Sequence, residues 1–203
     1  MSRRVTSEER QRELIAVALR QYVELGIAAT TRTTLAAELG VDRVIVHRLY
    51  PDLDDLFTDV IDHVGAVGAR AIDDAAAAAD ALGDDDELWS ELLGMLLRAA
   101  RAHPYEWQFL FLTPTGAGTA ERLVAFQSLM ADRIIGELTA RVDAGASAER
   151  RQEIGWAARF LYEGLFGSIA AHLAHGDEGD DGRFVAHLSV LIDDLLATEV
   201  DQG

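Results

Sequence analysis

The segment from residue 30 to residue 50 constrains the fold of this chain more than any other feature. It has the pattern of two short helices joined by a turn at Gly40. Thr30 or Thr31 can cap the first helix, and Asp42 can cap the second. Gly40 can adopt the left-handed backbone that a tight turn requires. This spacing predicts a helix-turn-helix.

The side chains of this segment divide into an inward and an outward set. The inward positions are Leu35, Ala36, Leu39, Val41, Val46 and Tyr50. A helix of this size fits the major groove of DNA, where Arg prefers guanine and apolar side chains contact thymine methyl groups. The candidate DNA-binding residues are Thr31, Arg32, Thr33, Arg43, Val44, Ile45, His47 and Arg48. Val44 and Ile45 have an alternative role, which is to pack against a neighbouring helix.

The rest of the chain also has a helical pattern. Alternating β-branched runs are absent, and Ala, Leu, Glu and Arg dominate. Thr6 and Glu9 form a capping box that opens a helix ending at Gly26. Further helices are expected from about residue 52 through the alanine run at 75–79, and over residues 88–102, 119–142, 148–175 and 183–198, with a short aromatic segment at 105–112. The pattern predicts an all-α fold.

The charge is distributed unevenly along the chain. The net charge is −17. Residues 1–50 contain eight Arg against six acidic residues, a net of +2, whereas the remainder contains 10 basic against 29 acidic residues, a net of −19. DNA phosphates require cations, so this asymmetry favours DNA binding at the N-terminal end. An acidic surface that keeps a protein soluble explains much of the remainder equally well.

Several classes of function find no support in the sequence. The chain has no cysteine, no apolar run long enough to span a membrane and no secretory signal, so we expect a cytoplasmic protein. No catalytic or cofactor motif is present, so we expect neither an enzyme nor a bound cofactor or metal. His172 and His175 lie one turn apart, near Asp177, Glu178 and His187. They could form a metal site, but capping a helix C-terminus or lining a dimer interface is the preferred interpretation.

Residues 14–57 resemble the DNA-binding domain of the TetR (tetracycline-repressor) family. The matching pieces are Glu24-Leu25-Gly26, Thr30-Thr31, Leu35-Ala36, Gly40-Val41, Tyr50-Pro51 and Leu56-Phe57. The resemblance implies about nine helices, with a three-helix DNA-binding domain at 1–52 and a larger effector-binding and dimerisation domain at 53–203. It also implies a homodimeric regulator, most simply a repressor that a small hydrophobic effector releases from a palindromic operator.

Four positions depart from the family pattern. Asp42 stands where Ser or Thr is usual, Val44 where a small residue is usual, His47 where Tyr is usual and Leu53 where Lys is usual. The family Tyr and Lys usually hold phosphates, so we expect fewer phosphate contacts and weaker or less salt-sensitive binding. The alternative function is a dimeric small-molecule-binding protein of the same fold with weak or lost DNA binding.

The helix at residues 155–175 is apolar on nearly every face, so it must be covered all round. A stripe of small residues along it would permit close approach of another helix: Gly164, Gly167, Ser168 and Ala171. The following helix carries apolar residues at matching spacing: Phe184, Leu188, Leu191, Ile192 and Leu195. Two copies could form a four-helix interface with two-fold symmetry. The competing interpretation is a buried core helix of a monomer.

The middle of the chain is rich in aromatic residues and supplies the candidate effector pocket. The expected lining residues are Trp107, Phe111, Phe126, Met130, Phe160 and Glu163. Pockets for small molecules are mostly apolar with a few polar groups, and Glu163 could accept a cationic ligand. The competing interpretations are that the aromatic residues belong to the core and that Glu163 pairs with Arg159 one turn earlier.

Overall fold

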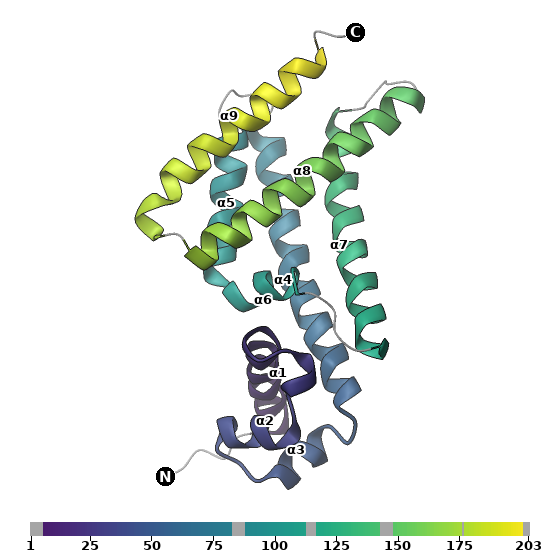
Figure 1. Cartoon of the computed structure of the whole chain (residues 1–203), viewed down its shortest axis with the longest axis vertical. Coiled ribbons are helices and arrows are strands. Elements are labelled where there is room, and N and C mark those ends of the chain that lie inside the picture. The colour runs from purple at the N-terminus through teal and green to yellow at the C-terminus, as the bar shows by residue number, and fades with distance from the viewer. Residues whose placement is uncertain (1–5, 83–87, 113–116, 143–147, 176, 201–203) are drawn as a thin grey trace. The chain divides into compact units, whose positions relative to one another are not determined.

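The computed structural model describes residues 6–82, 88–112, 117–142, 148–175 and 177–200. Within these ranges it contains nine α-helices, two short 3-10 helices and no strand, which confirms the all-α prediction (Figure 1). The helices are α1 (Ser7–Glu24), α2 (Arg32–Leu39), α3 (Arg43–Leu49), α4 (Leu53–Leu82), α5 (Leu88–Ala102), α6 (Pro104–Phe109), α7 (Ala117–Val142), α8 (Ala148–His175) and α9 (Asp181–Val200). The 3-10 helices are Ile27–Ala29 and Glu178–Asp180.

The chain forms two compact units. The described residues of 1–67 and 105–127 make the first unit, and those of 68–104 and 128–203 make the second. Two long helices, α4 and α7, contribute residues to both. The expected functional division after residue 52 concerns roles rather than contacts and stays a prediction. None of the described helices combines the length and apolarity that crossing a membrane requires.

Aromatic side chains form the centre of the first unit. The ring centroids of Tyr22 and Phe57 lie 5.7 Å apart, and those of Phe57 and Phe109 lie 6.2 Å apart. The guanidinium of Arg122 lies 5.2 Å from the centroid of the Phe57 ring, a distance at which cation and ring attract. These contacts join α1 to α4, α6 and α7. Burial raises the pKa of Tyr22, which is neutral in this core.

The helix α1 begins and ends as its sequence predicts. The Oγ1 of Thr6 accepts from the backbone N–H of Glu9 at 3.1 Å, and the Glu9 carboxylate accepts from the N–H of Thr6 at 2.8 Å. The capping box is therefore confirmed. Gly26 follows the helix with a φ of 88°, a conformation that non-glycine residues rarely adopt. The change of direction before α2 thus depends on this glycine.

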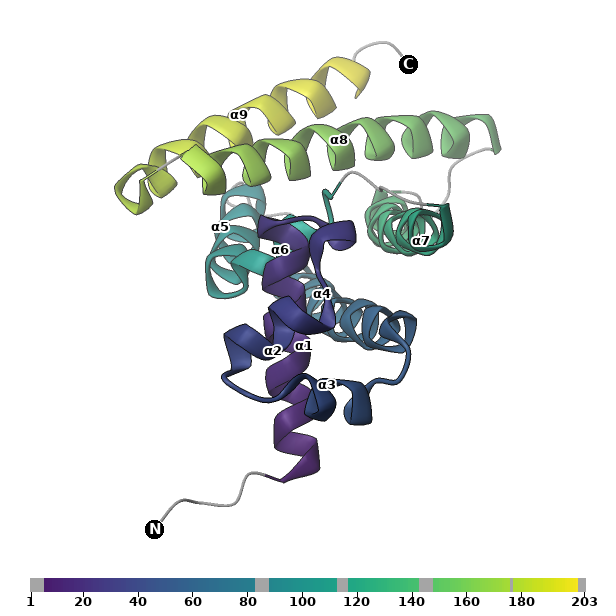
Figure 2. The same cartoon turned by 60° about the horizontal axis from the view of Figure 1, so that its bottom comes forward.

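In the second unit, α9 packs against α5, and α8 also contacts α5. The buried side chains here are apolar and come from all three helices: Leu93, Leu97, Ala100, Phe166, Ile169 and Ile192. The end of α8 meets the start of α9, as Figure 2 shows, and the rings of His172 and Phe184 stack there with centroids 4.1 Å apart.

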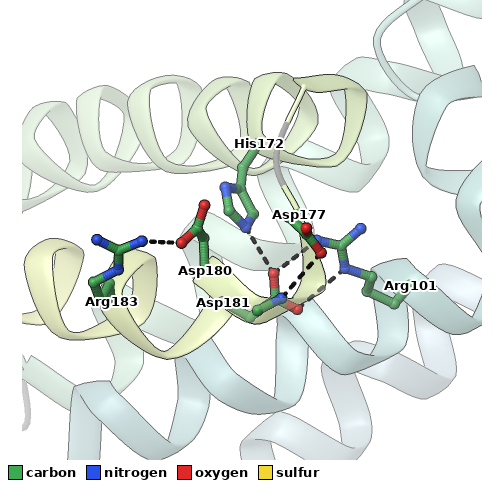
Figure 3. A network of polar contacts seen from close by, with 7 residues as sticks. Arg101, His172, Asp177, Asp180, Asp181 and Arg183 are labelled. Carbon is green, nitrogen blue, oxygen red and sulfur yellow. Dashed lines mark hydrogen bonds and ion pairs between the residues drawn. The ribbon is translucent and has the colours of Figure 1, made fainter.

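A polar cluster joins the same three helices (Figure 3). The carboxylate of Asp181 accepts from Nη2 and Nε of Arg101 at 2.7 and 3.1 Å, and the Nε2 of His172 lies 2.7 Å from its Oδ1. Hydrogen bonds from Arg101, with those of His172, hold the pKa of the Asp181 carboxyl below its ordinary value. The prediction that the last helix begins at residue 183 was wrong by two residues, since α9 begins at Asp181. Arg101 and His172 hold the Asp181 side chain in place, and an acidic residue is favoured in the first turn of a helix.

Candidate nucleic-acid interface

The first helix of the predicted helix-turn-helix is capped and turned by the expected residues. Thr31 precedes α2, and its side chain accepts from the N–H of Thr34 at 3.2 Å. At the other end Gly40 has φ 64° and ψ 35°, the left-handed conformation. The N–H of Val41 then donates to the carbonyl of Ala36 at 3.0 Å. The predicted cap at Thr31 and the predicted turn at Gly40 are confirmed.

The second helix, α3, is fixed at both ends. The Oδ1 of Asp42 accepts from the N–H of Val44 at 2.7 Å, so the predicted cap is confirmed. Val46 and Tyr50 are buried, as their inward assignment requires. The hydroxyl of Tyr50 donates to Oδ2 of Asp59 on α4 at 2.5 Å. Burial and this bond raise the pKa of Tyr50. The orientation of α3 is therefore tied to α4.

A buried amide sets the orientation of α2 on α1. Gln21 is buried, and its Nε2 donates to the Glu38 carboxylate at 2.5 Å while its Oε1 accepts from the hydroxyl of Thr34 at 2.7 Å. Arg20 also pairs with Glu38. This network was not predicted from the sequence. A signal existed, because Gln21 follows Leu14 by seven residues and thus lies on the buried face of α1.

The candidate DNA-binding residues are not all equally exposed. Six of them are exposed, and five of these six carry polar or charged groups: Thr31, Thr33, Arg43, His47 and Arg48. The sixth is Val44, whose side chain is 70% exposed. Ile45 is half-buried, in keeping with its alternative role in packing. Contact with DNA remains a prediction for the whole set.

Arg32 has a structural partner. It is half-buried, and its Nη2 donates to the carbonyl of Pro51 at 2.5 Å. This bond joins the start of α2 to the turn between α3 and α4. Leu53 is half-buried at the start of α4, where an apolar side chain offers no group to a phosphate.

Four candidate effector residues, in and between α6 and α7, are buried or half-buried within the two units. In the first unit Trp107 and Phe126 are buried and Phe111 is half-buried. Gly65 of α4 leaves room for the Phe126 ring, since a Cβ there would lie 3.3 Å from it. In the second unit Met130 is buried. Whether these residues contact an effector remains a prediction.

Two candidate effector residues are exposed on α8. Phe160 is 71% exposed, and Glu163 is also exposed. The carboxylate of Glu163 lies 3.9 Å from the guanidinium of Arg159, which also pairs with Asp132 on α7 at 3.1 Å. The geometry thus contains the pairing that the sequence offered as an alternative for Glu163. Its role toward an effector remains a prediction.

An exposed face runs along α8. Trp156 is 66% exposed, and it lies one turn before Phe160. Gly164 and Gly167 continue the exposed face, and a Cβ added at either would meet no atom within 4 Å. On α9, Val190 and Leu191 are exposed, Phe184 and Leu188 are half-buried and Ile192 is buried, while the side chain of Leu195 lies outside the described residues. The described chain leaves this aromatic face uncovered.

In the histidine and acid group around the end of α8, His172 has an ion pair and a ring contact. His172 pairs with Asp181, and no three His, Asp or Glu side chains among the described residues are arranged to hold a metal ion. The side chain of Glu178 lies outside the described residues.

The fold is similar to that of several solved structures. No protein-family model matches the sequence, and no curated protein sequence matches it. Among solved structures, a TetR-like transcriptional regulator from Rhodococcus sp. RHA1 has a TM-score of 0.69 and 18% identity over 97% of this chain and 99% of that one. The fatty acid degradation regulator FadR from Bacillus halodurans has a TM-score of 0.66 and 15% identity over 94% and 96%. A TetR-family transcriptional regulator from Pectobacterium atrosepticum has a TM-score of 0.54 and 19% identity over 94% and 95%.

Proposed function

We propose that this chain, whose fold is that of TetR-type regulators, is a DNA-binding transcription regulator that acts as a homodimer and responds to a small-molecule effector. The outward face of α3 carries the proposal. Arg43, His47 and Arg48 are exposed there, whereas Val46 and Tyr50 anchor the opposite side. A short helix held in this way can enter a major groove and present cations and donors to base edges.

The charge distribution supports an orientation on DNA. The net charge is +2 over residues 1–50, with eight Arg against six acidic residues, and −19 over the remainder, with 10 basic against 29 acidic residues. Phosphates attract the first segment and repel the second. The same charges favour docking through α2 and α3 over adsorption along other surfaces.

The exposed face of α8 supports homodimerisation. Two copies of Trp156 and Phe160, related by a two-fold axis, would cover each other's rings, and Gly164 and Gly167 would let the backbones approach. A two-fold dimer presents two α3 helices. Such a dimer matches an operator whose half-sites are related by the same symmetry.

We infer that the dimer represses transcription and that a small hydrophobic effector releases it. The single helix α4 supplies Leu53–Val67 to the first unit and continues as far as Leu82 in the second. Tyr50 and Asp59 tie α3 to this helix. An effector that binds the DNA-free arrangement of α4 more tightly than the DNA-bound one would lower DNA affinity by that difference.

The DNA proposal is tested by fluorescence anisotropy with the duplex directly upstream of the protein's own reading frame. At low salt the wild type is expected to bind, and Arg43→Ala or Arg48→Ala is expected to weaken binding by about tenfold or more. Arg98→Ala is the matched control, because it removes one exposed Arg from α5. Binding that Arg43→Ala, Arg48→Ala and Arg98→Ala all leave unchanged would refute a reading role for α3.

The alternative is a dimer of the same fold with weak or lost DNA binding. It rests on the exposed carboxylate of Asp42 beside α3, on the apolar Leu53 and on the net charge of −17. It is favoured if no duplex binds at low salt while the protein remains a dimer.

The effector proposal is tested by mass spectrometry of the purified protein and by adding candidate hydrophobic ligands to the DNA complex. A fatty acid is a sensible first probe, since one structural neighbour is a fatty acid degradation regulator.

A further inference from the structure

One apolar side chain interrupts the polar surface of α3. Val44 is 70% exposed, and in the described part of the first unit only Leu25, at 56%, and Val124, at 48%, are other exposed large apolar side chains. Residues three and four apart share a helix face, so Val44 lies beside His47 and Arg48. His47 and Arg48 of α3 thus flank this exposed apolar side chain.

The position of the Val44 side chain is fixed. Asp42 accepts from the N–H of Val44 at 2.7 Å, which holds the backbone at this residue. A β-branched side chain in a helix has one strongly preferred χ1 rotamer. The buried Val46 and Tyr50 hold the helix from its other side. The two methyl groups of Val44 are therefore presented to solvent in one orientation.

The chemistry of the major groove decides what such a group can recognise. Thymine presents a C5 methyl group there beside its O4 acceptor, whereas adenine, guanine and cytosine present donors and acceptors without a methyl group. An apolar side chain placed against those polar groups would leave them unsatisfied, at a cost in free energy. Placed against a thymine methyl, it buries apolar surface on both partners.

We propose that Val44 is a specificity-determining residue that selects a thymine in each half-site by contacting its C5 methyl group. This inference rests on the proposed DNA-reading function and names one base within it. Ile45, the other apolar candidate on α3, does not share the role, because it is half-buried and turned partly toward the protein. The inference thus separates two residues that the sequence could not distinguish.

The test removes the contacting apolar groups from each partner in turn, the C5 methyl of thymine and the two γ-methyl groups of Val44. Duplexes enriched from a random pool by the full-length protein supply the operator, and each symmetric pair of thymines is then replaced by deoxyuridine, which lacks only the C5 methyl. For the wild type, one pair of positions is expected to lose affinity by about fourfold per half-site, the effect of one buried methyl-sized group. For Val44→Ala, the same replacement is expected to change affinity by less than about twofold.

Val124→Ala is the matched control, since it removes the same groups from an exposed valine on α7. It is expected to retain the full sensitivity to deoxyuridine. Alanine is a stronger helix former than valine, so α3 is expected to persist in Val44→Ala, which circular dichroism checks. Enrichment of an operator in which no thymine is sensitive, or sensitivity that persists in Val44→Ala, overturns the inference alone. Failure to enrich any sequence overturns the proposed function with it.

Discussion

The α2–α3 region and the α8–α9 region cover their apolar side chains in different ways. In the first, the chain itself buries Leu35 and Val46 and leaves a mostly polar outer surface. In the second, the core is buried against α5, but Trp156 and Phe160 remain on an outer surface that no described residue covers. The apolar side chains of the first region are covered within the chain itself, whereas the second region leaves large apolar side chains exposed.

The two regions are therefore suited to different roles. Asp42, Val46 and Tyr50 hold α3 in place within the chain itself, which suits its proposed use as a recognition surface. An assembly surface is completed by its partner, and exposed aromatic side chains are the groups that contribute most there. Large contiguous patches of exposed apolar side chains mark interaction sites between proteins.

The largest effect is expected when charges are placed on the exposed face of α8. Replacing Trp156 and Phe160 together by Glu is expected to raise the dimer dissociation constant by about 100-fold or more, because two central aromatic side chains are lost and four like charges meet at the interface. Sedimentation velocity measures the change. Leu25→Glu, at an exposed leucine of the first unit, is the control and is expected to leave the dimer intact. A dimer that survives the double replacement would place the interface elsewhere.

The second test concerns the cluster that joins α5, α8 and α9. Asp181→Asn is expected to lower the free energy of unfolding by about 1–3 kcal/mol at pH 7, because it removes a carboxylate that accepts two bonds from Arg101. The adjacent Asp180→Asn is the control, since Asp180 pairs with the exposed Arg183. It is expected to cost less than about 1 kcal/mol. Urea titrations of both variants make the comparison.

The same pair predicts a pH dependence. The pKa of Asp181 is lower in the folded protein than its ordinary value, so the unfolded chain takes up the proton first as the pH falls. The wild type is expected to have the higher free energy of unfolding, by the same margin over Asp181→Asn at pH 7 and at pH 5. This margin is expected to shrink only below about pH 4, the ordinary pKa of an aspartate. An advantage that is lost between pH 7 and 5 would assign the effect to another group.

A smaller effect is expected at the turn that orients α3. Gly40→Ala is expected to cost about 1–2 kcal/mol, because an L-residue at φ 64° brings its Cβ close to the following carbonyl. Gly136→Ala is the matched control within α7, where an added Cβ meets no atom within 4 Å. There the replacement is expected to stabilise the helix by about 0.5–1 kcal/mol. Thermal unfolding is expected to show a lower melting temperature for Gly40→Ala and a higher one for Gly136→Ala. That result would show that Gly40 is required by its backbone conformation and that Gly136 is not.

The smallest effect separates a cap from its neighbour. Thr31→Ala is expected to cost about 1 kcal/mol, since the N–H of Thr34 loses its side-chain acceptor. Thr33→Ala, two residues later on the exposed side of α2, is expected to change stability by less than about 0.5 kcal/mol. Equal losses in a chemical denaturation series would show that the α2 cap does not hold the helix-turn-helix together.

The helices and their ends could be predicted from the sequence more completely than the surroundings of the candidate site residues. The boundaries of α5 and α8 match the expected ones, and the caps at Thr6, Thr31 and Asp42 are confirmed. The sequence did not distinguish Val44 from Ile45, since both are apolar residues of one short helix. It also gave no indication that Arg32 is held by the carbonyl of Pro51. Such details depend on the neighbouring helices, which the periodicity of one helix does not describe.

What the sequence determined by itself is the local architecture of the chain. A cap such as Thr31 and a turn such as Gly40 act over three or four residues, so their chemistry is legible in order along the chain. Only the tertiary structure decided which side chains face solvent and which polar groups meet. Asp181 and Arg101 lie 80 residues apart, and the exposure of Phe160 depends on every helix that could have covered it. Burial is a property of the packed chain, because it depends on residues that are distant in sequence.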